Sequence, residues 1–184
     1  MTRSMGVRGA NLRTAIPVAL VGWLVCVELV SGVLQGYYVT ISTEIARHLS
    51  IADADLNWFE AGQLLLSALS VPVLAKLGDM HGHKRVLLAS TVVVAGASWW
   101  MAFAGDFWSY LIAFSLQGVY AVWLPLEIAL IFDRGRRTGR AASETRRAAG
   151  LLVVGLETGA ILGALGAARA HAAFGEAMVP TLLV

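Results

Sequence analysis

The sequence predicts an all-α membrane protein with five complete spanning helices and the start of a sixth. Three observations support this fold class. Hydrophobic residues make up 58% of the 184-residue chain and charged residues only 14%, against about 25% charged residues in soluble domains. The charged residues are clustered, which leaves long uncharged stretches between the clusters. Several stretches reach about 20 residues, the length that an α-helix needs to cross a bilayer.

Each span is placed by an apolar run between polar clusters. We expect spans at about 15–38, 57–77, 86–105, 109–132 and 148–168, with a sixth beginning at about 177. The first run is too long for a cleaved signal peptide, and further spans follow it. The last run has only eight residues before Val184, so we expect residues 1–184 to be an incomplete bundle. The alternative is that residues 170–184 lie along the outer membrane interface.

The basic residues predict the orientation of the spans. All but two of the 14 Lys and Arg residues, Arg47 and Arg169, map to one side of the predicted membrane. By the positive-inside rule, the N-terminus is cytoplasmic and the protein is a multi-pass protein of the plasma (inner) membrane. A belt of aromatic residues is expected at the outer interface: Tyr37, Tyr38, Trp58, Phe59, Trp99, Trp100, Phe103, Phe107, Trp108 and Tyr110.

The net charge of +2 therefore does not indicate a nucleic-acid partner, because the basic residues determine topology beside an anionic lipid leaflet. The partner that they indicate is the lipid bilayer. The basic stretch 133–147 is either a solvated cytoplasmic loop or a lipid-binding strip. Cys26 is alone and lies in the middle of a span, so it cannot form an internal disulfide. His81 and His83 have no third ligand nearby in the sequence, so we expect no metal site.

The connection between the second and third spans is a tight cationic turn of about seven residues. Gly82 can adopt a positive φ at no steric cost, which suits a reversal of the chain. Asp79 lies at the end of a span, where a carboxylate can meet the N-terminus of the next helix. Lys84 and Arg85 open the third span and are expected to face anionic headgroups.

This turn resembles the loop signature of the major facilitator superfamily, G-x-x-x-D-[RK]-x-G-[RK]-[RK]. Asp79, Gly82 and Lys84 match it at the right spacing, whereas Ala75, Met80 and His83 occupy the other fixed positions. The resemblance implies that residues 1–184 form the N-terminal helical bundle of a transporter whose C-terminal half is missing. It also implies that Asp79, Gly82, Lys84 and Arg85 belong to a conformational-switch loop that holds the two halves together at the cytoplasmic side.

Glycines at four-residue intervals mark the fifth span. Gly155, Gly159 and Gly163 form one stripe, along which a neighbouring helix can approach closely. The segment also resembles the family's antiporter motif, G-x-x-x-G-P-x-x-G-G, with Ala160 and Ala164 as departures. Both interpretations, helix packing and antiport, stay open. A weaker resemblance, of Gln117-Gly118 to R-x-x-Q-G, lacks the arginine, which is Phe114 here.

Three acids lie within the spans: Glu28, Glu127 and Glu157. A charged residue at the bilayer centre costs about 2.5 kcal/mol or more on insertion scales, so each should face the protein interior or water. Each acid either carries a proton during transport or, when protonated, hydrogen-bonds to a neighbouring helix. Glu157 lies opposite the glycine stripe, which predicts an enclosed, cavity-lining fifth span. Pro125 frees the carbonyl of Ala121 close to Glu127.

The sequence thus predicts a secondary transporter of a small molecule, most similar to the drug–proton antiporter branch and working by proton-coupled efflux. Gln63 and Gln117 could supply amide groups to an amphipathic or cationic substrate, on which Trp23, Tyr120 and Trp123 could stack. The alternative is a non-transporting, truncated or scaffold-type membrane protein. We find no Gly-x-Ser-x-Gly, His-Glu-x-x-His or phosphate-binding loop in the sequence, so neither a catalytic residue nor a cofactor is expected.

The predicted topology can be tested with reporters of membrane sidedness. A reporter fused at Thr138 should be cytoplasmic and one fused at Asp53 external, because the basic loops stay on the cytoplasmic side. The opposite labelling of these two sites would overturn the whole topology.

Overall fold

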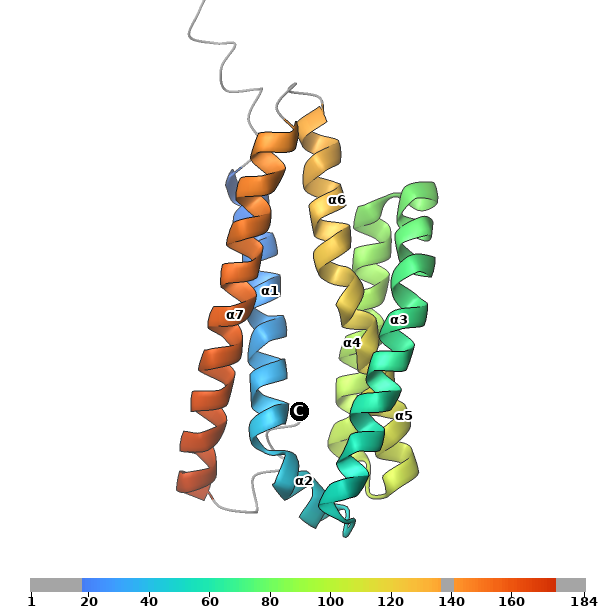
Figure 1. Cartoon of the computed structure of the whole chain (residues 1–184), viewed down its shortest axis with the longest axis vertical. Coiled ribbons are helices and arrows are strands. Elements are labelled where there is room, and N and C mark those ends of the chain that lie inside the picture. Colours follow the sequence, from blue (N-terminus) through green and yellow to red (C-terminus); the bar gives the residue numbers. More distant parts are fainter. Residues whose placement is uncertain (1–17, 137–140, 175–184) are drawn as a thin grey trace, which may run out of the picture.

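A computed structural model describes residues 18–136 and 141–174 of the chain, and these residues are helical apart from short connections (Figure 1). Five segments are long and apolar enough to cross a membrane: Ala19–Thr40, Asp53–His81, His83–Phe103, Phe107–Arg136 and Ala142–Ala170. They confirm the prediction of an all-α protein with five spans. The predicted sixth span near residue 177 lies outside the described residues.

The helices form two groups. The elements along the chain are α1 (Val18–Thr40), α2 (Ser42–His48), the 3₁₀ turn η1 (Asp53–Asp55), α3 (Leu56–His81), α4 (His83–Phe103), α5 (Phe107–Gln117), the 3₁₀ segment η2 (Gly118–Val122), α6 (Trp123–Arg136) and α7 (Ala141–Phe174). Helix α1 packs chiefly along α7, and α3, α4, α5 and α6 pack among themselves, while α6 also packs on α7 and joins the two groups (Figure 1). The fourth span consists of α5, η2 and α6 in succession.

The two ends of the bundle differ in chemistry. One end of the bundle holds the start of α1, the α3–α4 turn, the end of α6 and the start of α7 (Figure 1). We call this the basic end, because it carries Lys76, Lys84, Arg85, Arg134, Arg136, Arg146 and Arg147. The opposite end, with α2 and the α4–α5 connection, is the aromatic end. It exposes Trp58, Trp99, Trp100, Phe103 and Trp108.

Part of the predicted aromatic belt is instead buried core. Tyr38, Phe59 and Tyr110 are buried at the aromatic end, where they pack in one cluster with Ile41 and Met101. The rings of Phe59 and Tyr110 lie with their centroids 4.9 Å apart. The expectation of interfacial positions for these three residues was therefore wrong. Depth along a span places a ring near the interface, but the face of the helix decides whether it meets lipid or protein.

The α3–α4 turn is much shorter than predicted. Helix α3 continues to His81 and α4 begins at His83, which leaves Gly82 alone between them. Gly82 has a φ of 95°, the left-handed region in which glycine carries no penalty. The helices extend past the apolar runs because their polar last turns can remain helical while their side chains reach the membrane surface.

Glycines on both helices bring α1 and α7 into close contact. A Cβ atom at Gly159 or Gly163 would overlap the backbone of Leu29 or Val33 on α1. The same is true in the other direction, since a Cβ at Gly32 or Gly36 on α1 would overlap the backbone of α7. Small residues at these positions let two backbones approach as closely as helices in membranes can.

The fourth span changes its winding near its middle. Residues Gly118–Val122 form the 3₁₀ segment η2, which ends three residues before Pro125. Proline lacks an N–H, so the carbonyl four residues earlier, at Ala121, loses its α-helical partner there. The segment is held against α3, because Ser67 Oγ donates to the Gly118 carbonyl at 2.8 Å.

A glycine-to-alanine pair tests the α1–α7 contact. Gly159→Ala should lower the free energy of unfolding by about 1–3 kcal/mol, because the new methyl group collides with the backbone of α1. Gly166→Ala on the same helix is the matched control, since nothing lies within 4 Å of its Cβ position. Thermal unfolding of the purified protein in detergent measures both effects. Equal stability of the two variants would contradict the close packing.

Candidate functional site

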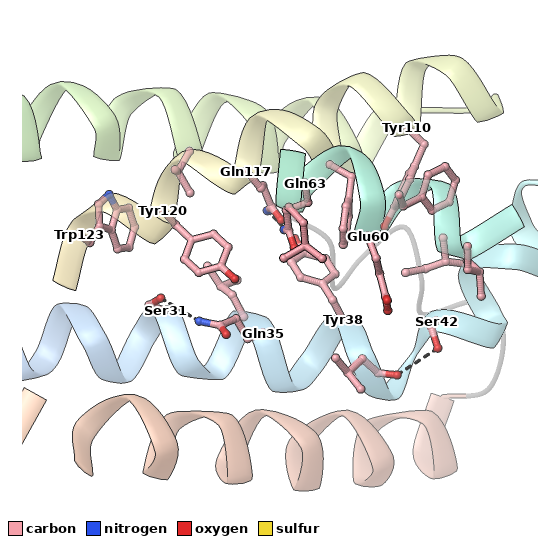
Figure 2. A pocket seen from close by; sticks show the side chains of 18 residues that line it. Ser31, Gln35, Tyr38, Ser42, Glu60, Gln63, Tyr110, Gln117, Tyr120 and Trp123 are labelled. Carbon is pink, nitrogen blue, oxygen red and sulfur yellow. Dashed lines mark hydrogen bonds between the residues drawn. The ribbon is translucent and has the colours of Figure 1, made fainter. Parts of the chain in front are cut away.

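A cavity of about 260 Å³ lies between α1, α2, α3 and the fourth span (Figure 2). Its walls combine aliphatic side chains with polar and aromatic ones that reach in from all four elements. Gln63, Gln117, Tyr120 and Trp123, which the sequence singled out, all line it. The sequence did not single out Ser31, Gln35, Ser42 and Glu60, which also line it.

Gln117 is a structural link within the cavity wall. Its Nε2 donates to Ser98 Oγ on α4 at 2.8 Å and to the hydroxyl of Tyr38 on α1 at 3.2 Å. The side chain is buried, so both amide hydrogens are satisfied without water. Gln117 therefore ties α1 and α4 to α5 at the cavity. On α1 itself, Gln35 Nε2 donates to Ser31 Oγ at 3.3 Å.

Aromatic rings form the wall toward the aromatic end. Tyr38 lies edge-on to Phe114 with centroids 6.0 Å apart, and Tyr110 stacks on Phe114 at 5.9 Å. Phe59 packs against the same two rings of α5. Faces of aromatic rings attract cations and apolar groups alike.

Glu60 gives the cavity its charge. It is the one charged side chain among the described lining residues, and Figure 2 shows its carboxylate directed into the cavity beside Tyr38 and Ser42. Since the other polar groups are neutral, the cavity suits a neutral or cationic guest with aromatic or aliphatic surface. A spacing pattern could not reveal Glu60, because it lies at the outer end of its span among other polar residues.

The two tryptophans proposed to stack on a substrate differ in their environments. Trp123 is only 5% exposed, and its indole N–H donates to Ser90 Oγ on α4 at 3.1 Å. Trp23 is 73% exposed on the outside of α1. Trp123 thus contributes a ring to the cavity wall, and Trp23 does not.

Two of the three intramembrane acids meet in the interior. Glu28 on α1 and Glu127 on α6 are 2% and 0% exposed, and their carboxyl groups face each other within hydrogen-bonding reach. Glu28 lies one turn before Ser31 and Glu127 one turn after Trp123. The pair therefore lies directly beside the cavity, toward the basic end.

Glu157 lies apart from this pair. It is exposed on α7, on the side away from the glycine stripe. The outer face of α7 also exposes Val154, Ile161 and Leu165, so within the described residues the fifth span is open on this side. The expectation of an enclosed fifth span does not hold there, because α7 packs on α1 and α6 through its other face.

A polar cluster closes the basic end. His83, the first residue of α4, bridges two acids: its Nε2 lies 3.3 Å from Asp79 Oδ1 on α3, and its Nδ1 lies 2.9 Å from Asp133 Oδ2 on α6. Asp79 thus approaches the start of α4 through the His83 side chain. Lys84 and Arg85 are exposed next to it. Sequence spacing could not show Asp133 as the third member, because a different span supplies it.

The geometry offers a cavity and buried acids but no metal centre in the described part of the chain. Across residues 18–136 and 141–174, no three His, Cys, Asp or Glu side chains are placed to hold a metal ion. The described interior is instead arranged around hydrogen-bonding amides, hydroxyls and carboxyls.

Comparison with known proteins agrees with this architecture. The family model described as Major Facilitator Superfamily matches residues 24–181. The chain is also similar to "Multidrug resistance protein MdtG" of Proteus mirabilis (strain HI4320), with 34% identity over 101 residues. That alignment covers 55% of this chain but only 24% of the relative, so the matched part spans about a quarter of the relative's length. This chain belongs to the major facilitator superfamily, a family of membrane transporters and not of enzymes.

Proposed function

We propose that this chain binds a small molecule in the cavity between α1, α3 and the fourth span and takes part in moving it across the membrane by alternating access. The observation that carries the proposal is the cavity itself, which lies within the spans and is lined by amides, hydroxyls and aromatic rings. Its position beside two buried acids offers a means of coupling transport to protons. Membership of a transporter family supports it.

The proposed substrate is amphipathic or cationic, and the proposed direction is efflux. Glu60 supplies a negative charge to a cavity that is otherwise neutral and aromatic, which favours a cation with apolar surface. The similar Proteus protein is named a multidrug resistance protein, and we propose export by this chain in keeping with that name.

The proposal includes a second bundle. Alternating access works by rocking one half of a transporter against the other around a central site, and we propose that residues 1–184 serve as the N-terminal half. A C-terminal half would supply the opposite wall of the transport path. The basic end would face the cytoplasm of the plasma (inner) membrane, in keeping with the positive-inside rule.

The α3–α4 turn is the proposed conformational switch. Gly82 alone separates two long helices, and His83 joins α3, α4 and α6 through Asp79 and Asp133. Lys84 and Arg85 are free to meet headgroups or the other half. A movement of α3 against α4 would have to break or re-form the contacts of His83.

A charged and an uncharged probe test the proposed binding site. Glu60→Gln should weaken binding of a lipophilic quaternary-ammonium dye about two- to fivefold, as expected for loss of one partly exposed ionic contact. Binding of an uncharged dye of similar shape should stay unchanged. Fluorescence titration of the purified protein measures both affinities.

Asp53→Asn is the matched control, because Asp53 is an exposed acid near the same end but outside the cavity. Equal losses for Glu60→Gln and Asp53→Asn would show a general surface-charge effect. If neither dye binds a well-folded protein, the cavity is not a binding site for such molecules, and the result favours the alternative of a non-transporting, scaffold-type protein.

Proton coupling is tested by transport in vesicles from cells that express the natural gene. Glu28→Gln or Glu127→Gln should abolish dye efflux driven by a pH gradient between about pH 5.5 and pH 8.5, because an amide keeps the shape but cannot release a proton. Glu157→Gln should retain it, since Glu157 lies away from the cavity. Normal efflux by all three variants would make these acids structural.

A further inference from the structure

We infer that Glu28 and Glu127 form a single proton-binding site, in which the first proton to bind is shared between the two carboxyl groups and holds α1 against α6. Its part in transport rests on the proposed function, but the site itself can be tested without transport.

The burial of Glu28 and Glu127 shows that the pair must hold at least one proton. Both side chains are almost completely buried, and the apolar cluster next to them includes Leu24, Leu126 and Leu152. In such surroundings two adjacent carboxylates cannot both stay ionised at an acceptable cost. At least one proton is therefore required for α1 and α6 to lie as they do.

The absence of other hydrogen-bond donors among the described residues indicates that the proton lies between the two carboxyl groups. Among the described residues no hydrogen-bond donor reaches Glu28 Oε1 or either carboxyl oxygen of Glu127. An ionised carboxylate offers only acceptors, whereas a protonated one also donates. A proton on either carboxyl group supplies the missing donor to the other, and a hydrogen bond from a carboxyl to a carboxylate is among the strongest in proteins.

No cation from a neighbouring element replaces that proton in the described structure. The ionisable group that each carboxyl faces is the other carboxyl. The lysine and arginine side chains on the packed spanning helices are exposed toward the ends of those helices: Lys76 on α3, Lys84 and Arg85 on α4, Arg134 and Arg136 on α6, and Arg146, Arg147 and Arg169 on α7. The other acids and histidines of these helices are Glu60, Asp79 and His81 on α3, His83 on α4, Asp133 on α6, and Glu144, Glu157 and His171 on α7, none of them beside the pair in sequence.

The position of the pair gives the proton a mechanical effect. Glu28 belongs to α1, which packs chiefly on α7, whereas Glu127 belongs to α6, which packs on both α7 and α4. The cavity lies between α1 and the fourth span (Figure 2). Loss of the shared proton leaves two like charges in contact and favours separation of α1 from α6. Proton occupancy is thereby linked to the width of the cavity.

Infrared spectroscopy tests whether the proton is shared. The purified chain in lipid bilayers is titrated from about pH 5 to pH 10 while the carbonyl stretch of protonated carboxyl groups is recorded. As the pH is raised, one component of this carbonyl signal should disappear last. Glu28→Gln should remove this component completely, and Glu127→Gln should remove it to the same extent. The double variant should lose no more of it, because the two residues act as one site. Glu157→Gln, the control, should keep it.

Independent acids would give a different result, since each single variant would then keep the other acid's share of that signal at an unchanged pH. This outcome would overturn the inference. The inference would also be overturned if the wild-type titration shifts when sodium replaces potassium at constant ionic strength, because sodium would then compete with the proton for the pair. The wild-type titration needs no variant, so a variant that fails to fold does not remove the test.

A distance measurement tests the mechanical link. Cys26 on α1 is exposed and is the chain's one cysteine, so Val92→Cys on the exposed face of α4 completes a pair for spin labels. The distance between the labels should increase at alkaline pH and should not change with pH in a Glu127→Gln background. A constant distance in the otherwise unaltered chain would refute the link. Failed dye efflux with an intact pH response would instead count against the proposed function alone.

Discussion

The close approach of α1 and α7 is the contact on which the rest of the described structure depends. Glycines on both helices bring the two backbones together over Leu29 and Val33, so α1 is committed to α7 and touches the other spans only lightly. This division leaves room for a cavity on the other side of α1. It also places Glu28 and Tyr38, both on α1, at the boundary between the two groups of helices. Packing on one face of a helix thus creates the polar site on another.

Polar groups at this boundary are satisfied by different means along the length of α1. Toward the aromatic end, Tyr38 accepts a hydrogen bond from Gln117, which also reaches Ser98. Near the middle, Gln35 and Ser31 bond to each other. Toward the basic end, Glu28 has Glu127 as its facing partner. In a membrane interior an unsatisfied polar group is costly, so a contact that depends on a proton is the one most open to change.

Much of this fold could be predicted because the bilayer imposes a simple length rule. The apolar runs located all five spans, and the glycine in the α3–α4 turn was expected from its conformational freedom. What the sequence could not show were contacts between distant residues. Nothing local indicates that Glu28 meets Glu127 while Glu157 stays outside, or that His83 reaches Asp133. Tyr38, Phe59 and Tyr110 were misplaced for the same reason. The sequence shows how far along a span each residue lies, but which face of a helix meets protein and which meets lipid depends on the neighbouring helices.

The 3₁₀ segment in the fourth span sets the rotational phase of everything that follows it. A 3₁₀ helix turns about 120° and rises about 2.0 Å per residue, against about 100° and 1.5 Å for an α-helix. Over the five residues of η2, the difference amounts to about 100° of rotation and about 2.5 Å of length. If Gly118–Val122 wound as α-helix, α6 would turn by about a quarter of a circle relative to α5, and Glu127 would leave the face that meets α1. The 3₁₀ winding of this segment therefore determines which side chains of α6 face the protein interior.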